Sequence, residues 1–173
     1  MTNSLWKQLL ESVTGKQSVD RAFDKIGLLI ERERTNHPTP GDDGGVRELI
    51  GDDYADIELT DTDVREAVDC LLHYVSTTNH PDSRAIWALE KSCETRVVPA
   101  FIDLLRATAS DLGGEDIARC ALQGIITCGI SSEYREEALQ VLHYAALDGS
   151  DDIRNRANEY IAHYESISNE FKE

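Results

Sequence analysis

The chain has 173 residues, which fits one compact domain and is long enough to bury a core without disulfide bonds. Lysine and arginine number 17 against 33 aspartates and glutamates, so the formal net charge is -16 at pH 7. A charge of this sign repels nucleic-acid phosphates and anionic lipid, so it argues against both as partners and favours a cationic one.

The cysteines indicate a reducing environment. Cys70, Cys93, Cys120 and Cys128 form no CxxC pair, and all four fall within helical patterns. We interpret them as reduced core thiols in a cytoplasmic protein, because free cysteine packs as a small hydrophobic residue. No apolar run has the length of a signal peptide or a membrane span, so we expect no membrane contact.

Two amphipathic helices are predicted before residue 35. The first follows an apolar stripe within residues 5–13 and ends at Gly15. The second begins after Ser18, whose side chain can cap it, and extends to Arg34.

Residues 35–59 interrupt the helical pattern with prolines and glycines, and only residues 46–50 could form a short helical turn. The segment is strongly acidic and has one basic residue, Arg47. One interpretation is a solvated, mobile linker. The other is a protein-binding epitope, in which Tyr54 and Ile57 make apolar contacts and the surrounding carboxylates steer a basic partner.

Six further amphipathic helices are predicted between residue 60 and residue 164. Thr60 and Asp63 have the spacing of a capping box, Asp82 can cap the next helix through Glu94, and Pro99 suits a first helical turn. In the helix that starts near Ile117, apolar residues form one stripe, and small residues form a second. The small residues are Cys120, Gly124 and Cys128. A helix that is apolar on two sides is expected to lie between neighbours.

A repeated unit underlies these later helices. Ala88, Ala121 and Ala157 occupy equivalent positions in three segments, at spacings of 33 and 36 residues. Spacings of roughly 20–50 residues are typical of stacked supersecondary units. We therefore predict that these alanines lie where helices touch.

The segment from Arg96 to Leu105 resembles the second helix of a HEAT repeat, and Asp63-Val64-Arg65 and Asp152-Ile153-Arg154 resemble the opening of a first helix. This resemblance implies an all-α fold, a short right-handed HEAT-like α-solenoid of about seven or eight helices in a single domain. In that fold, residues 1–34 would be an N-terminal helical cap, 35–59 an acidic loop, 60–165 the repeats and 166–173 a tail.

Motifs for enzyme chemistry are lacking. Cys70 and His73 could reach one metal ion, but no second pair is spaced to complete the site, so we expect no metal and no cofactor. The chain has no HExxH motif, no nucleophile elbow and no glycine-rich phosphate loop. It also lacks the His-Glu dipeptide that HEAT-like di-iron hydroxylases would imply and the basic groove of HEAT-like DNA glycosylases, so we interpret Trp87 as a core residue.

A second candidate binding surface is the polar side of the second helix of each predicted repeat. The alternative interpretation is that these polar residues are simply exposed to solvent.

Small, acidic, all-helical proteins of this kind resemble immunity proteins of bacterial polymorphic-toxin and contact-dependent inhibition systems. The resemblance implies a protein that is monomeric when free and that covers the active site of one basic toxin domain, often a nuclease. The expected partner-binding residues are Asp52, Asp53, Tyr54, Asp56, Glu58, Asp103, Glu136, Gln140 and His143.

Two other functions stay open. A HEAT-like scaffold or adaptor from a salt-adapted organism would also carry five lysines against seventeen aspartates. An enzyme such as a HEAT-like lyase or hydroxylase is the third interpretation, and the chain lacks the motifs expected of it.

Overall fold

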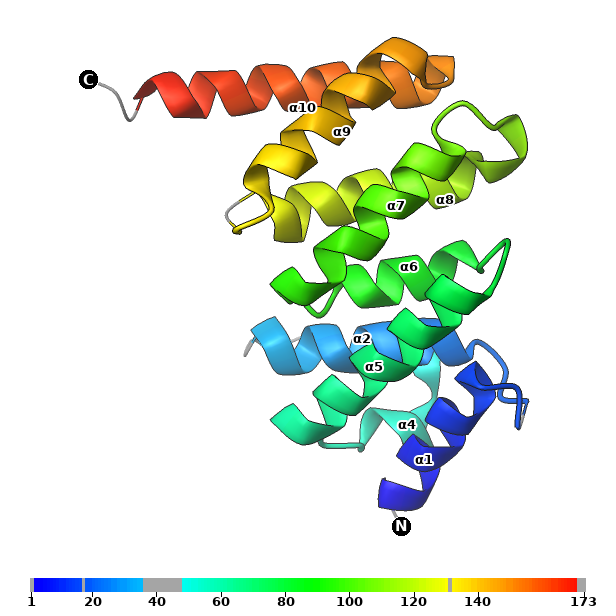
Figure 1. The fold of residues 1–173 in the computed structure, drawn as a ribbon. Helices are drawn as coiled ribbons and strands as arrows, with labels where there is room; N and C mark the ends of the chain where they lie inside the picture. The colour runs from blue at the N-terminus through cyan, green and yellow to red at the C-terminus, as the bar shows by residue number, and fades with distance from the viewer. Residues whose placement is uncertain (1, 17, 36–47, 131, 171–173) are drawn as a thin grey trace. The chain divides into compact units, whose positions relative to one another are not determined.

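The computed structural model describes residues 2–16, 18–35, 48–130 and 132–170. Those residues form nine α-helices and contain no strand, which confirms the all-α class (Figure 1). The chain divides into two compact units, Met1–Cys93 and Glu94–Glu173.

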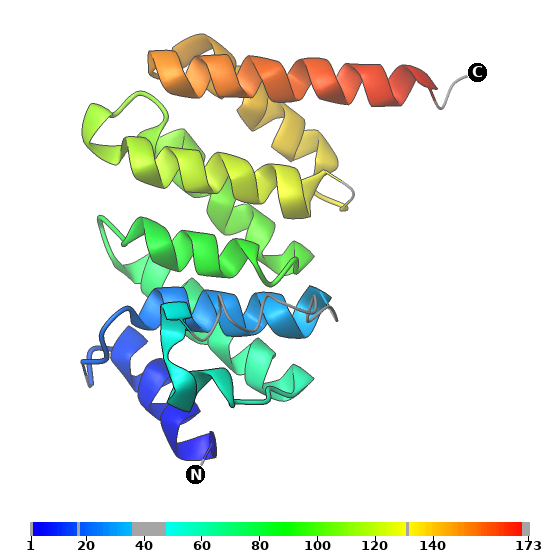
Figure 2. The ribbon, with the colours of Figure 1, turned by 180° about the vertical axis from the view of Figure 1, so that it is seen from behind.

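The first unit is built from two pairs of helices. α1 (Thr2–Val13) packs against α2 (Ala22–Thr35), and α5 (Asp61–Thr77) packs against α6 (Ser83–Glu90). α1 also contacts α5, and α2 also contacts α6, so α1 and α5 form one layer and α2 and α6 the other (Figures 1 and 2). The short helix α4 (Asp52–Ala55) lies against α1.

The second unit repeats this two-layer plan. α7 (Val98–Thr108) pairs with α8 (Glu115–Gly124), which continues as a wider π-helical turn, η3 (Ile125–Gly129). α9 (Arg135–Asp148) pairs with α10 (Asp151–Glu170). α7 contacts α9 and α8 contacts α10, so α8 lies between two neighbours as its two stripes predict. Short 3-10 turns, η1 (Thr95–Val97) and η2 (Leu112–Gly114), precede α7 and α8.

The apolar stripes read from the sequence form the cores of these units. Burial of each large aliphatic side chain stabilises the fold by roughly 1.5–3 kcal/mol. The largest fully buried side chains are Leu9, Ile26, Leu29, Ile30, Ile57, Leu71, Ile86 and Leu89 in the first unit, and Phe101, Ile102, Leu105 and Leu122 in the second.

The repeat positions are buried as predicted. Ala88, Ala121 and Ala157 each have 0% of their surface exposed. In the small-residue stripe, Gly124 lies under Phe101, and a Cβ added to Gly124 would be 2.5 Å from the ring atom Cε2. Small residues therefore allow the helices to approach closely at these points.

The expected helix starts at Thr60, Asp82 and Pro99 are confirmed. Thr60 and Asp63 form the complete capping box, because the Thr60 hydroxyl accepts from the Asp63 amide and the Asp63 carboxylate accepts from the Thr60 amide. The Asp82 carboxylate accepts from the Arg84 amide at 3.0 Å. Pro99 stands in the first turn of α7, where a missing N–H costs nothing.

Two helix boundaries differ from the prediction. α2 begins at Ala22 and not after Ser18, because Arg21 has a φ of 53° and interrupts the helical path. α6 ends at Glu90 and not at Glu94, because Cys93 has a φ of 51°. Both positions adopt the left-handed region, which a continuous helix does not tolerate.

The interpretation of the cysteines is correct in part. All four thiols are free, and Cys128 is buried. Cys70 and Cys120 are half-buried, whereas Cys93 is exposed and lies outside a helix, so its assignment to the core is wrong.

Part of the acidic segment 35–59 is structured. Residues 48–50 are helical, as the expected short turn suggested, and α4 follows them. Ile50, Ile57 and Leu59 are buried, and the Arg32 guanidinium donates a hydrogen bond to the Ile57 carbonyl. Residues 48–59 are therefore anchored to the first unit, while 36–47 lie outside the described residues.

Candidate functional site

The first group of predicted partner-binding residues lies on residues 52–58. Asp53, Asp56 and Glu58 are exposed, and the Asp52 side chain lies outside the described part of the chain. Tyr54 is half-buried, and the Lys25 ammonium lies 4.3 Å from the centre of its ring.

Ile57 requires a correction. Its side chain is 1% exposed and belongs to the core, so it cannot contact a partner as the epitope interpretation expected. Alternating polar and apolar residues from Asp56 to Leu59 explain the difference, because Ile57 and Leu59 face inward between the exposed carboxylates.

The second predicted group lies in the second unit. Glu136, Gln140 and His143 are exposed on α9, and their spacing of four and three residues places them on one face of the helix. The Asp103 side chain is 81% exposed on the neighbouring helix α7, and its carboxylate lies 4.0 Å from the Arg106 guanidinium. We name these four residues the α7–α9 face.

Carboxylates elsewhere in the second unit are paired with arginine. Arg119 lies 3.0 Å from Asp116 and 3.3 Å from Asp152, and Arg156 lies 2.8 Å from the same Asp152 carboxylate. The hydrogen bond from Arg156, followed by that from Arg119, lowers the pKa of Asp152. These pairs connect the starts of α8 and α10.

At the start of α9, the carboxylates are not paired with arginine, because the guanidinium of the neighbouring Arg135 lies over the Tyr164 ring. Glu133, Glu136 and Glu137 are exposed and form no hydrogen bond or ion pair with the residues that the structure describes. Two of them stand in the first helical turn, where the helix dipole favours negative charge. Charge is therefore neutralised around the starts of α8 and α10, whereas the three carboxylates at the start of α9 have no arginine partner.

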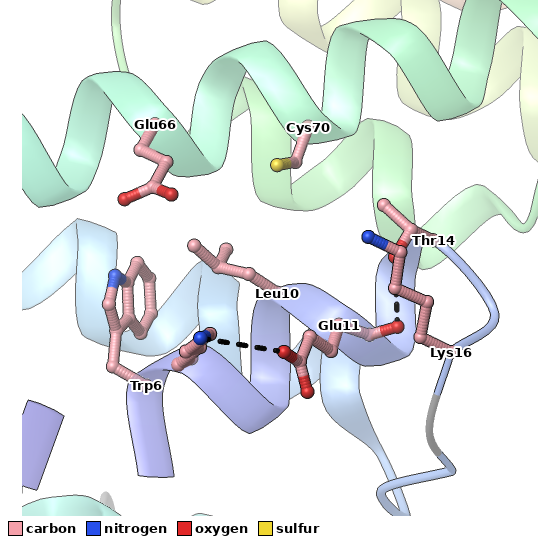
Figure 3. Close-up of a pocket in the computed structure, with 8 residues that line it drawn as sticks. Trp6, Leu10, Glu11, Thr14, Lys16, Glu66 and Cys70 are labelled. Atoms are coloured by element: carbon pink, nitrogen blue, oxygen red, sulfur yellow. Dashed lines mark hydrogen bonds and ion pairs between the residues drawn. The ribbon is translucent and has the colours of Figure 1, made fainter. Parts of the chain in front are cut away.

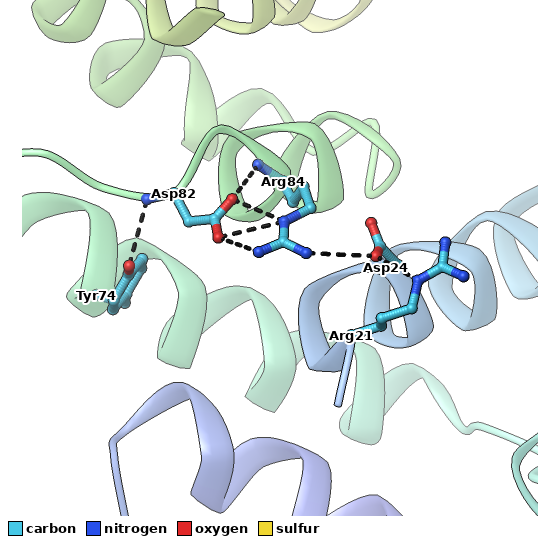
Figure 4. Close-up of polar contacts among 5 residues, drawn as sticks. All are labelled: Arg21, Asp24, Tyr74, Asp82 and Arg84. Carbon is cyan, nitrogen blue, oxygen red and sulfur yellow. Dashed lines mark hydrogen bonds and ion pairs between the residues drawn. The ribbon is translucent and has the colours of Figure 1, made fainter. Parts of the chain in front are cut away.

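The first unit shows the same contrast. Asp82 is held by Arg84, which also lies 3.8 Å from Asp24, and Arg21 lies 3.1 Å from that second carboxylate (Figure 4). The hydrogen bonds from Arg84 lower the pKa of Asp82, and the Tyr74 hydroxyl accepts from the Asp82 amide at 3.3 Å. This network joins α2 to the α5–α6 connection and is structural.

In contrast, some carboxylates on residues 48–58 have no partner among the described residues. Glu48, Asp53 and Glu58 are exposed and form neither a hydrogen bond nor an ion pair there. Groups of exposed carboxylates without a described partner therefore occur on residues 48–58 and at the start of α9.

A pocket of about 390 Å³ lies between α1 and α5 (Figure 3). α1 supplies Trp6, Lys7, Leu10 and Glu11, the turn after it supplies Thr14 and Lys16, and α5 supplies Glu66 and Cys70. Burial raises the pKa of the Cys70 thiol, and the Glu66 and Asp69 carboxylates raise it further. The thiol is therefore neutral at pH 7 and a poor nucleophile.

One polar atom of this pocket lacks a partner. Trp6 is only 3% exposed, yet its Nε1–H makes no hydrogen bond with the described residues. A buried donor left without an acceptor costs about 1–3 kcal/mol.

The sequence did not predict the pocket. Trp6 and Leu10 share one face of α1, and Glu66 and Cys70 share one face of α5, because each pair is four residues apart. These spacings were visible in the sequence. That the two faces meet depends on helix packing between segments about 60 residues apart.

Across the described residues, histidine, cysteine and acidic side chains form no group of three or more that could hold a metal ion, and the Cys70–His73 pair gains no further ligand there. No helix in residues 2–16, 18–35, 48–130 or 132–170 combines the length and hydrophobicity of a membrane span.

No family model, curated protein or solved structure was found to match the chain.

Proposed function

We propose that the protein is an immunity protein that binds one basic toxin domain and neutralises it by covering the active site. The observation that supports this proposal best is a group of three exposed carboxylates without a described partner at the start of α9. The carboxylates at the starts of the neighbouring helices α8 and α10 are paired with arginine. We further propose that the paired helices are HEAT-like repeats of a right-handed solenoid, and that the protein acts in the cytoplasm without catalysis.

The net charge of -16 attracts a cationic partner most strongly where carboxylates are not neutralised by arginine. A carboxylate paired with arginine produces little field beyond the pair, whereas Glu133, Glu136 and Glu137 keep theirs. A surface of one sign raises the association rate of an oppositely charged partner by roughly 10- to 1,000-fold at low salt. The open carboxylates would stand in for the phosphates that a nuclease-type cleft binds.

The α7–α9 face also offers groups for specificity. Gln140 and His143 are exposed beside Glu136, so an amide and an imidazole lie next to the carboxylate. Neutral hydrogen-bonding groups beside a steering charge favour one partner geometry over another, because mispaired polar groups are costly once water is excluded. In the first unit, Tyr54 and the exposed carboxylates of residues 53–58 provide a second acidic surface.

The test is protection against the toxin domain encoded by the neighbouring gene. Co-expression should restore growth, and the two proteins should copurify as a stoichiometric complex. The Glu136→Lys, Glu137→Lys double variant should lose protection. The Asp148→Lys, Glu159→Lys variant makes the same change in net charge at other exposed positions and should retain it.

Failure of the wild-type protein to bind or protect would refute the proposal. Equal protection by both double variants would show that the function does not depend on the carboxylates at the start of α9. Circular dichroism should first show that each variant keeps the wild-type helical content.

A scaffold or adaptor from a salt-adapted organism is the second candidate function. It is favoured by the same open carboxylates together with five lysines in the whole chain. Such a protein would gain stability steeply in thermal melts from low salt to molar salt, whereas the immunity function requires no such gain.

A further inference from the structure

We propose that the pocket between α1 and α5 binds the C-terminal end of a short peptide. The terminal carboxylate would lie at Lys16, a backbone amide at Trp6 and Glu66, and an apolar side chain on Leu10 and Cys70. This inference rests on the first unit alone and is independent of the immunity function.

The buried indole indicates a ligand that carries a hydrogen-bond acceptor. Trp6 is 3% exposed, and its Nε1–H has no partner in the described residues. Figure 3 shows the indole nitrogen on the side of the ring that faces Glu66 of α5. A buried indole N–H usually has an acceptor, and the carbonyl of a bound peptide supplies one.

The Glu66 carboxylate indicates a donor next to that acceptor. Glu66 is exposed at the pocket and makes no hydrogen bond or ion pair with the described residues. An indole N–H and a carboxylate that face each other match the carbonyl and N–H of a peptide backbone.

The opposite end of the pocket carries positive charge. The Lys16 side chain lies there beside Thr14 (Figure 3), and its ammonium makes no hydrogen bond or ion pair with the described residues. The other lysine of the pocket, Lys7, lies 4.0 Å from Glu11 and is already paired. Lys16 is therefore the ammonium available to a ligand carboxylate.

The middle of the pocket is apolar, and its length suits a peptide. Leu10 and the neutral Cys70 thiol lie between the two ends. From Trp6 to its end at Val13, α1 rises about 10 Å, at about 1.5 Å per residue. An extended peptide of about three or four residues covers that length at roughly 3.4 Å per residue. The volume of about 390 Å³ lies within the range of small-ligand sites.

The test is a titration followed through the two indole N–H signals in ¹⁵N–¹H spectra. The probes are acetyl-Ala-Leu-Ala with a free C-terminal carboxylate and the same peptide with a C-terminal amide. The free acid should shift the Trp6 signal in a saturable way and leave the Trp87 signal unchanged, with a Trp87→Phe variant assigning the two. The amide should bind about tenfold more weakly, because it lacks the charge that pairs with Lys16.

Two lysine variants provide the control. Lys16→Met should weaken the free acid about tenfold and leave the amide unchanged. Lys25→Met removes the same charge from a lysine of α2 that does not line the pocket, and it should change either affinity less than about twofold. The proposal is overturned if the Trp6 signal does not shift up to about 10 mM peptide. It is also overturned if acid and amide bind equally, or if the two lysine variants have the same effect.

Discussion

Replacement of Gly124 by alanine should destabilise the protein, although the same change usually stabilises a helix. Alanine is favoured over glycine by about 0.5–1 kcal/mol inside a helix. Here a Cβ would lie 2.5, 2.6 and 2.7 Å from three atoms of the Phe101 ring. Ordinary contact begins near 3.4 Å, so the ring or the helix has to move by almost 1 Å.

The ring has no free space to move into, because Phe101 is 0% exposed. Overpacking a core by one methyl group costs about 1–3 kcal/mol. After subtraction of the helix preference, we expect Gly124→Ala to lower the free energy of unfolding by about 1–2 kcal/mol. That loss corresponds to a decrease in Tm of roughly 2–8 °C.

The assay is urea unfolding of four proteins: wild type, Gly124→Ala, Phe101→Leu and the double variant. A smaller residue at position 101 leaves room for the new methyl group, so Gly124→Ala should be neutral or stabilising in the Phe101→Leu background. The interaction free energy of the cycle should be at least about 1 kcal/mol. A Gly124→Ala variant with a higher Tm than wild type, or a cycle without coupling, would refute the packing argument.

Further predictions concern caps, pH and thiol reactivity. Thr60→Val removes the capping hydroxyl and should lower the free energy of unfolding by about 1 kcal/mol, measured as a lower urea midpoint at an unchanged slope. Hydrogen bonds from Arg84 hold the pKa of Asp82 below its ordinary value of 3.8. Ionised Asp82 therefore favours the folded state above about pH 4, and this contribution decreases as the pH falls through the lower folded-state pKa. Asp82→Asn keeps a capping oxygen and should cost less than about 1 kcal/mol at pH 7 and less at pH 2 than at pH 7, as chemical unfolding at both pH values would show. With limiting iodoacetamide, mass spectrometry should find exposed Cys93 modified first and buried Cys128 last; equal modification of both thiols would contradict their burial.

The local features of the fold could be predicted from the sequence. The capping box at Thr60, the cap at Asp82 and the buried alanines Ala88, Ala121 and Ala157 all follow from short spacings. Such signals depend on residues within one or two helical turns, so a single sequence contains them. The pairing of helices into two layers within each unit depends on long-range packing, which short sequence spacings do not encode.

The predictions that failed concern backbone conformation and contacts between segments far apart in the sequence. Arg21 and Cys93 adopt positive φ values without being glycine, so nothing in their residue type marked the helix ends. Ile57 is buried because the short helix α4 lies against α1 and residues 56–59 follow it along the first unit. The exposed positions on α9 could be read from helical spacing. Which carboxylates have arginine partners could not, because Arg119 reaches Asp152 across 33 residues of sequence.

The most direct measurement of the proposed function is the association rate constant with the basic toxin domain, followed by stopped flow at several salt concentrations. The wild-type rate constant should decrease at least about tenfold between about 50 and 500 mM NaCl, because salt screens the open carboxylates. Glu136→Gln with Glu137→Gln should lower the low-salt rate constant several-fold and flatten the salt dependence, whereas Asp148→Asn with Glu159→Gln should do so much less. A wild-type rate constant that is independent of salt, or no association at all, would contradict the proposal that the exposed carboxylates at the start of α9 steer a basic partner.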